Sequence, residues 1–328
     1  MSKELMSQLY DSGVKWITRG FTSEFFTLYV SLTYFCVFWF ISPNIASWYN
    51  LGNLISNLLP LFVLAIGQTV VMITAGIDLS ITSAVSLASV VGTMMMTSGA
   101  APEFLITPAG VVMMIGVGLM VGMLNGAAVV WLEMPPFIVT LTTMIFARGL
   151  AIWITQSQNI FNLPSVFNSL DAYALPVTVI VFAVSAVLLK KSLLGRWIYA
   201  IGHNSKAALI SGVNVNRTLL FAYAFSGLCA GVAAVLYTAR IETGSPTMGD
   251  KILLDVIGAT VIGGTSLFGG KGKMLWTLYG VLFITLLDNT LNMYGLPFSI
   301  IIIAKGAVIL SAALLDAFRN KKIGRAHV

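Results

Sequence analysis

The chain has 328 residues, of which 58% are hydrophobic and 9% charged, and its mean hydropathy is +0.92. Soluble proteins carry about 25% charged residues, so this composition excludes a soluble domain and predicts an all-α polytopic membrane protein. The net charge of +6 does not indicate nucleic-acid binding, because the basic residues gather in short segments between apolar runs.

Ten apolar runs approach the roughly 20 residues that a membrane crossing requires. They cover residues 25–42, 52–75, 80–98, 108–131, 137–157, 174–189, 219–239, 252–268, 274–292 and 297–317. Ten crossings place both termini on one side, together with a polar insert at 190–217 and a turn that contains Lys271 and Lys273. Most of the 18 Lys and Arg residues then lie on that side, which the positive-inside rule makes cytoplasmic. We therefore predict a cytoplasmic segment 1–24, one transmembrane domain 25–317 and a cytoplasmic tail 318–328.

Polar or glycine-rich stretches interrupt the apolar runs at three places: TAGIDLSITS (74–83), EMPPFIVTLTT (133–143) and VIGGTSLFGGKGK (261–273). Non-helical backbone at membrane depth is tolerated only where protein or water satisfies it. The first and third breaks hold loosely corresponding places in the two halves, as in transporters with internal repeats. The third apolar run is rich in Ser and Thr, so we expect it to be buried among other helices or broken.

Four of the charged residues within or beside the apolar runs are candidates for a role at membrane depth. Asp78, with Ser80, is positioned to cap the helix that follows, and this cap is either purely structural, which we favour, or part of a solute path. Arg148 follows the second break and can satisfy backbone carbonyls or reach Asp78. Asp288 and Lys305 lie at comparable depth on the last two runs and are predicted to pair, either as a structural ion pair, which we favour, or in a gating or pathway role.

The polar insert Leu193–Arg217 is far longer than a return to the membrane requires. It predicts a short helix from Ser205 to Ile210, capped by Asn204 and closed by Ser211-Gly212. This helix is either a docking element for a partner or an ordinary amphipathic loop with basic anchors. A second polar segment, Ala239–Asp255, alternates in charge and is either a docking surface or a solvated loop whose ion pairs contribute little.

Several of these stretches resemble the permease subunits of bacterial ABC importers of the ribose type. The shared motifs are GIDLS (76–80), NG (125–126) with PPFIVTLTTM (135–144), Arg148-Gly149, LGRWIYAIGHNSKAALISGVNVNR (194–217) and GGTSLFGGKG (263–272). They keep the family's order and cover most of the chain from about residue 50 to 317. The chain departs from the family at Ala75, where a second glycine is common, and in its final IGRAHV.

The resemblance implies a type II ABC importer-like core that works as a dimer, with a second permease copy or paralogue, in the bacterial cytoplasmic membrane. A separate ATP-binding subunit would bind ATP and Mg²⁺, and a periplasmic binding protein would deliver a monosaccharide or similar small polar solute. The binding protein would dock on Arg240, Glu242, Asp250 and Lys251. The helix that couples the chain to the ATPase would comprise Gly202, Asn204, Ser205, Lys206, Ala207, Ala208 and Gly212. Candidates to line the translocation path are Asp78, Ser80, Asn125, Pro136, Thr140, Arg148, Gly263, Gly264 and Thr265.

The chain itself is not expected to be an enzyme or to bind a cofactor or metal. The Gly-rich break fails the GxxxxGK[ST] spacing, because Gly270 stands where Lys is required. His203 and His327, the only histidines, lie outside the apolar runs, so neither an intramembrane Ser–His site nor a histidine metal site is indicated. Two alternatives stay open. One is an ABC importer of a nucleoside, a furanone-like signal or a branched-chain amino acid; the other is an ion-coupled secondary carrier that uses the four charged residues of the runs.

Overall fold

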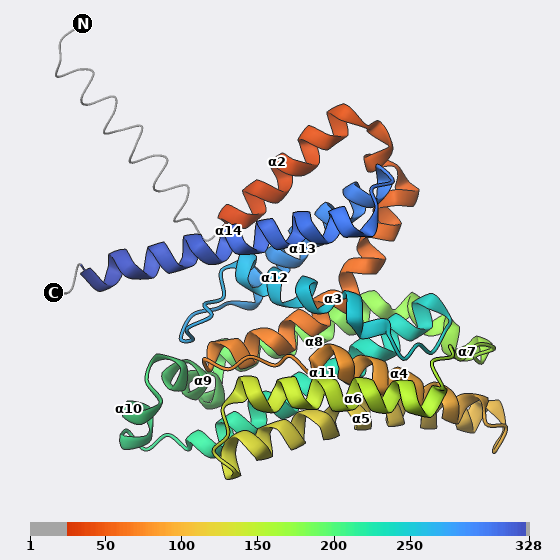
Figure 1. Cartoon of the computed structure of the whole chain (residues 1–328), viewed down its shortest axis with the longest axis horizontal. Coiled ribbons are helices and arrows are strands. Elements are labelled where there is room, and N and C mark those ends of the chain that lie inside the picture. The colour runs from red at the N-terminus through yellow and green to blue at the C-terminus, as the bar shows by residue number, and fades with distance from the viewer. Residues whose placement is uncertain (1–24, 326–328) are drawn as a thin grey trace, which may run out of the picture.

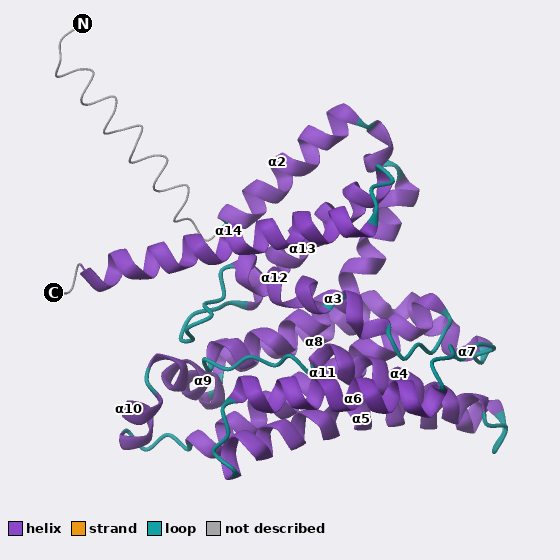
Figure 2. Cartoon of the chain, viewed as in Figure 1, coloured by secondary structure: helices purple, strands orange, loops and turns teal. Residues whose placement is uncertain are grey.

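The computed structural model describes residues 25–325, and regular structure in that range is helical (Figure 2). Within this range one isolated bridge joins Ile160 to Gly244. The long helices are α2 (Phe26–Ile41), α3 (Trp48–Ile73), α4 (Ile81–Thr97), α5 (Glu103–Trp131), α6 (Pro136–Thr155), α8 (Ala174–Lys191), α11 (Val215–Ile241), α13 (Met274–Met293) and α14 (Phe298–Arg325). The shorter elements are η1 (Pro43–Ala46), α7 (Ser165–Asn168), η2 (Ser169–Tyr173), α9 (Leu193–His203), α10 (Ser205–Ile210), η3 (Met248–Lys251) and α12 (Leu253–Gly263).

Six helical segments between residues 25 and 325 are long and apolar enough to cross a membrane: α3, α5, α6, α11, α13 and the stretch Ser165–Lys191 that ends in α8. The runs predicted at 25–42, 80–98 and 297–317 correspond to shorter apolar helices, namely α2, α4 and the first part of α14. The run predicted at 252–268 is helical only in part, because α12 has 11 residues. Such a helix spans roughly 16 Å, about half of the hydrocarbon core. The chain is thus an all-α polytopic membrane protein, and ten crossings remain a prediction.

Several segments that are distant in the sequence gather at one end of the molecule (Figure 1, left). This end holds α9, α10, the start of α2 and the end of α14. The Thr27 hydroxyl of α2 donates to the Ile262 carbonyl near the end of α12, over 2.8 Å. We call this end of the molecule the basic end, since the polar insert 190–217, with its Lys and Arg residues, lies there. The predicted segment 1–24 lies outside the described residues, and α14 runs on through Arg325, so part of the predicted tail extends the last helix.

A stripe of glycines joins α5 to α11. Gly118 and Gly122 are four residues apart and therefore share one face of α5. A Cβ added at Gly122 would stand 2.3 Å from the Tyr223 carbonyl oxygen of α11, and one added at Gly227 would stand 2.3 Å from the Gly118 carbonyl oxygen. The two backbones are in direct contact, which is the small-residue packing that lets membrane helices approach closely.

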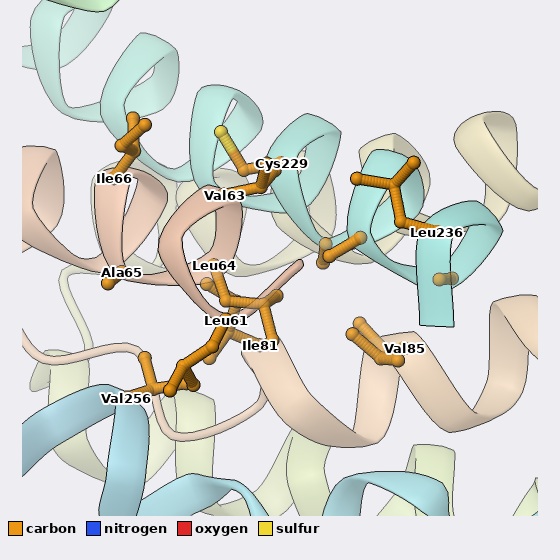
Figure 3. Close-up of a cluster of buried hydrophobic side chains, with 14 of the residues drawn as sticks. Leu61, Val63, Leu64, Ala65, Ile66, Ile81, Val85, Cys229, Leu236 and Val256 are labelled. Carbon is orange, nitrogen blue, oxygen red and sulfur yellow. The ribbon is translucent and has the colours of Figure 1, made fainter. Parts of the chain in front are cut away.

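The buried core is built around α3, in which every residue from Leu59 to Ile73 is buried. Leu61 and Leu64 of this helix meet Ile81 at the start of α4 and Val256 of α12 in one apolar cluster (Figure 3). A core shared by α3, α4, α11 and α12 explains why residues from both halves of the chain fold as one unit.

The Ser- and Thr-rich third run forms α4, and it is buried among other helices, as predicted. The Ser89 and Thr238 hydroxyls lie 2.7 Å apart and tie α4 to α11. The Gly249 N–H donates to the Ser86 hydroxyl over 2.8 Å and ties the η3 segment to the same helix. Polar side chains on α4 therefore act as links between helices, in keeping with buried polar groups in membrane bundles.

Candidate functional site

The polar insert folds into two consecutive helices at the basic end. The predicted short helix is confirmed as α10, and its N-cap is Asn204, whose Oδ1 accepts from the Ala207 N–H over 3.0 Å. Gly212 has a φ of +83° and reverses the chain after α10, as a C-terminal glycine does. The region before α10 is not a loop but the helix α9, whose N-cap is Ser192.

The exposed side chains of α10 differ from those expected to dock. We call α9 and α10 together the hairpin. Ala208 is only 5% exposed, because it packs inside this hairpin against Ile201 and Val213. Leu209 and Ile210 instead point away from the protein, with 63% and 88% of their surface exposed. Ala208 is therefore a core residue of the hairpin, and the two neighbouring apolar side chains form its free surface.

The hairpin is attached to the membrane core at the end of α3. The Gly270 N–H of the Gly-rich turn donates to the Ile73 carbonyl over 2.9 Å, and a Cβ added at Gly202 of α9 would overlap that carbonyl oxygen. The Tyr199 hydroxyl donates to the Gly272 carbonyl over 2.6 Å, and burial raises the pKa of this tyrosine. Gly202, predicted as a coupling residue, is thus an internal contact of α9 with α3. We call this junction the Ile73 clamp.

Next to the clamp, Ala75 adopts a φ of +63°, which is a left-handed conformation that glycine takes more readily than alanine. A glycine here, which the resemblance drawn from the sequence implies, would take this φ without strain. We expect Ala75→Gly to stabilise the protein by about 1 kcal/mol or less, because the left-handed penalty that it removes, about 1 to 2 kcal/mol, outweighs the chain entropy that glycine adds to the unfolded state. The melting temperature of the variant in detergent, compared with that of the wild type, measures this change in stability. Ala127→Gly, in the regular helix α5, should instead lower the melting temperature; a similar fall for Ala75→Gly would contradict the prediction.

Asp78 forms the centre of a buried polar cluster. Its Oδ1 accepts from the Ser80 N–H over 3.0 Å and from the Ser80 hydroxyl over 2.7 Å, and its Oδ2 accepts from the Ser226 hydroxyl of α11 over 2.8 Å. Asn125 of α5 donates to the Ser80 hydroxyl over 2.6 Å. Asp78 therefore caps α4 as predicted, whereas the Ser80 side chain joins α4 to α5 and makes no cap bond of its own. The cluster links three helices, which is the geometry expected of a structural role.

The second break lies beside this cluster. Pro136 is the first residue of α6, where a proline loses no hydrogen bond. The Thr140 hydroxyl donates to the Ile77 carbonyl over 3.0 Å, so the start of α6 contacts the segment that carries Asp78. Of the candidate path residues, Asp78, Ser80, Asn125, Pro136 and Thr140 are thus brought together in the structure.

The remaining path candidates lie elsewhere. Arg148 does not reach Asp78; its guanidinium lies 2.7 Å from Asp250 Oδ2 in the η3 segment. Gly263 ends α12 and packs against the Trp276 backbone, and Gly264 follows it in a left-handed conformation with a φ of +109°. Thr265 is buried at the start of the Gly-rich turn, near the basic end.

The charged residues expected to receive a binding protein are partly engaged within the chain. Besides the Asp250 pair, Lys251 lies over the Phe298 ring at 5.3 Å, and the Arg240 Nε donates to Asn57 Oδ1 over 3.2 Å. Glu242 is exposed and ends α11. The segment between α11 and α12 is therefore folded onto α4, α6 and α14 and is not a free loop.

The predicted pair of Asp288 and Lys305 is confirmed, with 2.6 Å between Asp288 Oδ1 and the ammonium. A third residue was missed. Asp255, assigned from the sequence to the polar segment, lies in the first turn of α12 and holds the same ammonium at 2.9 Å. Lys305 of α14 thus bridges carboxylates of α12 and α13 at a buried position.

Comparison with known proteins gives consistent matches along the chain. Residues 50–315 match the family model described as branched-chain amino acid transport system / permease component. The ribose import permease protein of Haemophilus influenzae is 37% identical over 295 residues, which cover 86% of this chain and 89% of that protein. The ribose import permease protein of Bacillus subtilis is 38% identical over 285 residues, with coverages of 84% and 87%. The D-allose transport system permease protein of Escherichia coli is 33% identical over 265 residues, with coverages of 79% and 80%. No solved structure matches the chain significantly.

Proposed function

This chain belongs to the family of branched-chain amino acid transport system permease components, and on that premise we propose that it is the membrane subunit of an ATP-driven importer for a monosaccharide or similar small polar solute. It is a multi-pass protein of the inner membrane and a transport component, not an enzyme. The sugar assignment is supported by relatives named for ribose and D-allose, which the chain matches over most of their length. These relatives favour a sugar over the other solutes considered above.

The partners follow from the proposed type of transporter. An ATP-binding subunit would hold ATP and Mg²⁺ and would contact the basic end, which the positive-inside rule makes cytoplasmic. A periplasmic binding protein would deliver the solute at the opposite end, where Glu242 is exposed. A second copy of the chain, or a paralogue, would complete a dimer with a type II core and both termini in the cytoplasm.

The observation that carries the coupling role is the exposed apolar pair on α10. A six-residue helix that is capped at both ends and packed on α9, which in turn contacts α3, has little freedom of its own. Leu209 and Ile210 lie exposed in the polar insert, between Lys206 and Arg217. Exposed apolar side chains on a rigid element are typical anchors for a partner's pocket. The apolar pair would enter a groove of the ATPase, and movement of α10 would reach α3 through the Ile73 clamp.

We expect Ile210→Ser to weaken ATPase binding and ATP-driven uptake by at least about tenfold, the loss typical of an interface anchor. The change is confined to an exposed side chain, so the permease itself should remain folded. Co-purification with the ATPase and sugar uptake in proteoliposomes measure both effects. Substitutions at Ala208 or Gly212 are less suitable, because the first lies in the hairpin core and the second requires a positive φ.

Ile180→Ser is the matched control, since Ile180 is also exposed but lies on α8, away from the hairpin. It should retain the ATPase and transport normally. Normal uptake by Ile210→Ser would refute α10 as the coupling helix. Uptake driven by an ion gradient without ATP would replace the importer with the secondary carrier considered above.

A further inference from the structure

Gln68 is a fully buried side chain without a hydrogen-bond partner. It lies in the last third of α3 with 0% exposure, and neither its Nε2 nor its Oε1 has a partner among the described residues. Glutamine is seldom fully buried, and the great majority of buried polar atoms in proteins are satisfied. Apolar packing therefore does not account for an amide at this position.

The side chain lies on the face of α3 that α12 covers. Around α3, Gly67 packs on α11, Thr69 is bonded to α13, and Met72 accepts a hydrogen bond from Thr260 of α12. At 100° per residue, Gln68 lies one turn before Met72, on nearly the same face. One turn earlier on this stripe, Leu64 belongs to the cluster that includes Val256 of α12 (Figure 3). The buried amide is thus enclosed between α3 and α12.

The helix that covers Gln68 is short and lies backbone to backbone on α13, since a Cβ added at Gly280 of α13 would overlap the Ala259 carbonyl oxygen. α12 has 11 residues, and in its first turn Asp255 forms an ion pair with Lys305 of α14. Its other end passes into the Gly-rich turn at Gly264, where the backbone is left-handed. Its polar contact with α3 is Thr260 donating to the sulfur of Met72, which is a weak acceptor. To part from α3, this helix must lose the Thr260–Met72 contact and the apolar packing of Val256 against Leu61 and Leu64, while its packing on α13 can be kept.

We propose that Gln68 contacts the solute on the translocation path and that α12 covers it in this conformation. Displacement of α12 exposes the amide, whose NH₂ and carbonyl can donate to and accept from adjacent hydroxyls of a polyhydroxylated solute. The conformation in which the amide is exposed satisfies its two polar atoms, which have no partner when α12 is in place. This inference rests on the proposed sugar-import function.

The first experiment is cysteine accessibility at this position. Gln68→Cys is made in a chain with Cys36→Ser and Cys229→Ala, reconstituted with its ATPase and binding protein, and treated with a charged methanethiosulfonate. We expect no labelling at rest and labelling during ATP turnover with ribose. Val70→Cys is the matched control, since Val70 is equally buried on α3 but lies on the opposite face. Labelling of neither cysteine during turnover, or of both alike, overturns the proposal.

The second experiment is Gln68→Leu, which retains the approximate volume and removes the polar atoms. The melting temperature should be equal to or above that of the wild type, while ribose uptake should fall roughly fivefold, as for one lost hydrogen bond. A glutamine held by a trapped water predicts the reverse, with a lower melting temperature and uptake that follows the amount of folded protein. Wild-type uptake by Gln68→Leu overturns this inference alone, whereas a wild-type chain without ATP-driven sugar uptake overturns the proposed function.

Discussion

Replacing Gly122 by alanine is expected to lower stability by about 3 kcal/mol and to reduce the folded protein in the membrane. The added Cβ would lie 2.3 Å from the Tyr223 carbonyl oxygen and 2.9 Å from Gly227. Both neighbours are backbone atoms, which cannot rotate aside as a side chain can, so α5 and α11 must separate. Overpacking of this kind costs about 1 to 3 kcal/mol and sometimes more. Thermal unfolding in detergent and the yield of monodisperse protein measure the effect.

Gly116→Ala provides the control on the same helix. Nothing lies within 4 Å of a Cβ at Gly116, so alanine there should be neutral or slightly stabilising through its higher helix propensity. The contrast separates packing between helices from the general effect of a glycine in a helix. Equal melting temperatures for the two variants would show that the contact of α5 with α11 does not determine stability.

Lys305→Met should be the second strongly destabilising change. The ammonium lies 2.6 Å from Asp288 and 2.9 Å from Asp255, and its removal leaves the buried Asp255 carboxylate and the half-exposed Asp288 carboxylate without a cation. Removing one partner of a buried ion pair costs about 3 to 5 kcal/mol, because the remaining charge is not compensated. We expect a large fall in melting temperature and accumulation of misfolded protein.

Neutralising the buried partner should restore part of this loss. In Lys305→Met combined with Asp255→Asn, one uncompensated carboxylate is gone, and the double variant should be more stable than Lys305→Met alone. Lys251→Met is the control for the loss of a lysine, since Lys251 is exposed and contributes about 1 kcal/mol or less through the Phe298 ring. If the double variant is no more stable than Lys305→Met, the carboxylates are not the cause of the loss.

Hydropathy predicted the all-helical membrane class, and local capping chemistry predicted α10 with its cap at Asn204. Both are properties of contiguous residues, so the sequence expresses them directly. The pairing of Asp288 with Lys305 was also predictable, because two consecutive antiparallel runs place them at comparable depth. Asp255 was missed because it was assigned to the polar segment 239–255, although the predicted run 252–268 also contains it, and no local pattern shows that the first turn of α12 meets α14.

Other features depend on which face of a helix meets the protein. Ala208 and Ile210 are two residues apart on a six-residue helix, and only the fold decides that the first is buried and the second exposed. The length of α12 was overestimated because the apolar run continues through Val261 and Ile262 toward Leu267 and Phe268, beyond the end of the helix at Gly263. The glycines of α5 did carry a readable signal, since Gly118, Gly122 and Gly126 recur every four residues.

The Ile73 clamp limits how this protein can be re-engineered. One carbonyl oxygen at the end of α3 receives the Gly270 N–H and leaves no space for a side chain at Gly202. Three segments from distant parts of the sequence therefore fit one another at a single point. A chimera that grafts only α9 and α10 from another permease would combine surfaces that were not selected together. A functional graft for a foreign ATPase must carry the hairpin, the Gly-rich turn and the end of α3 as one matched set.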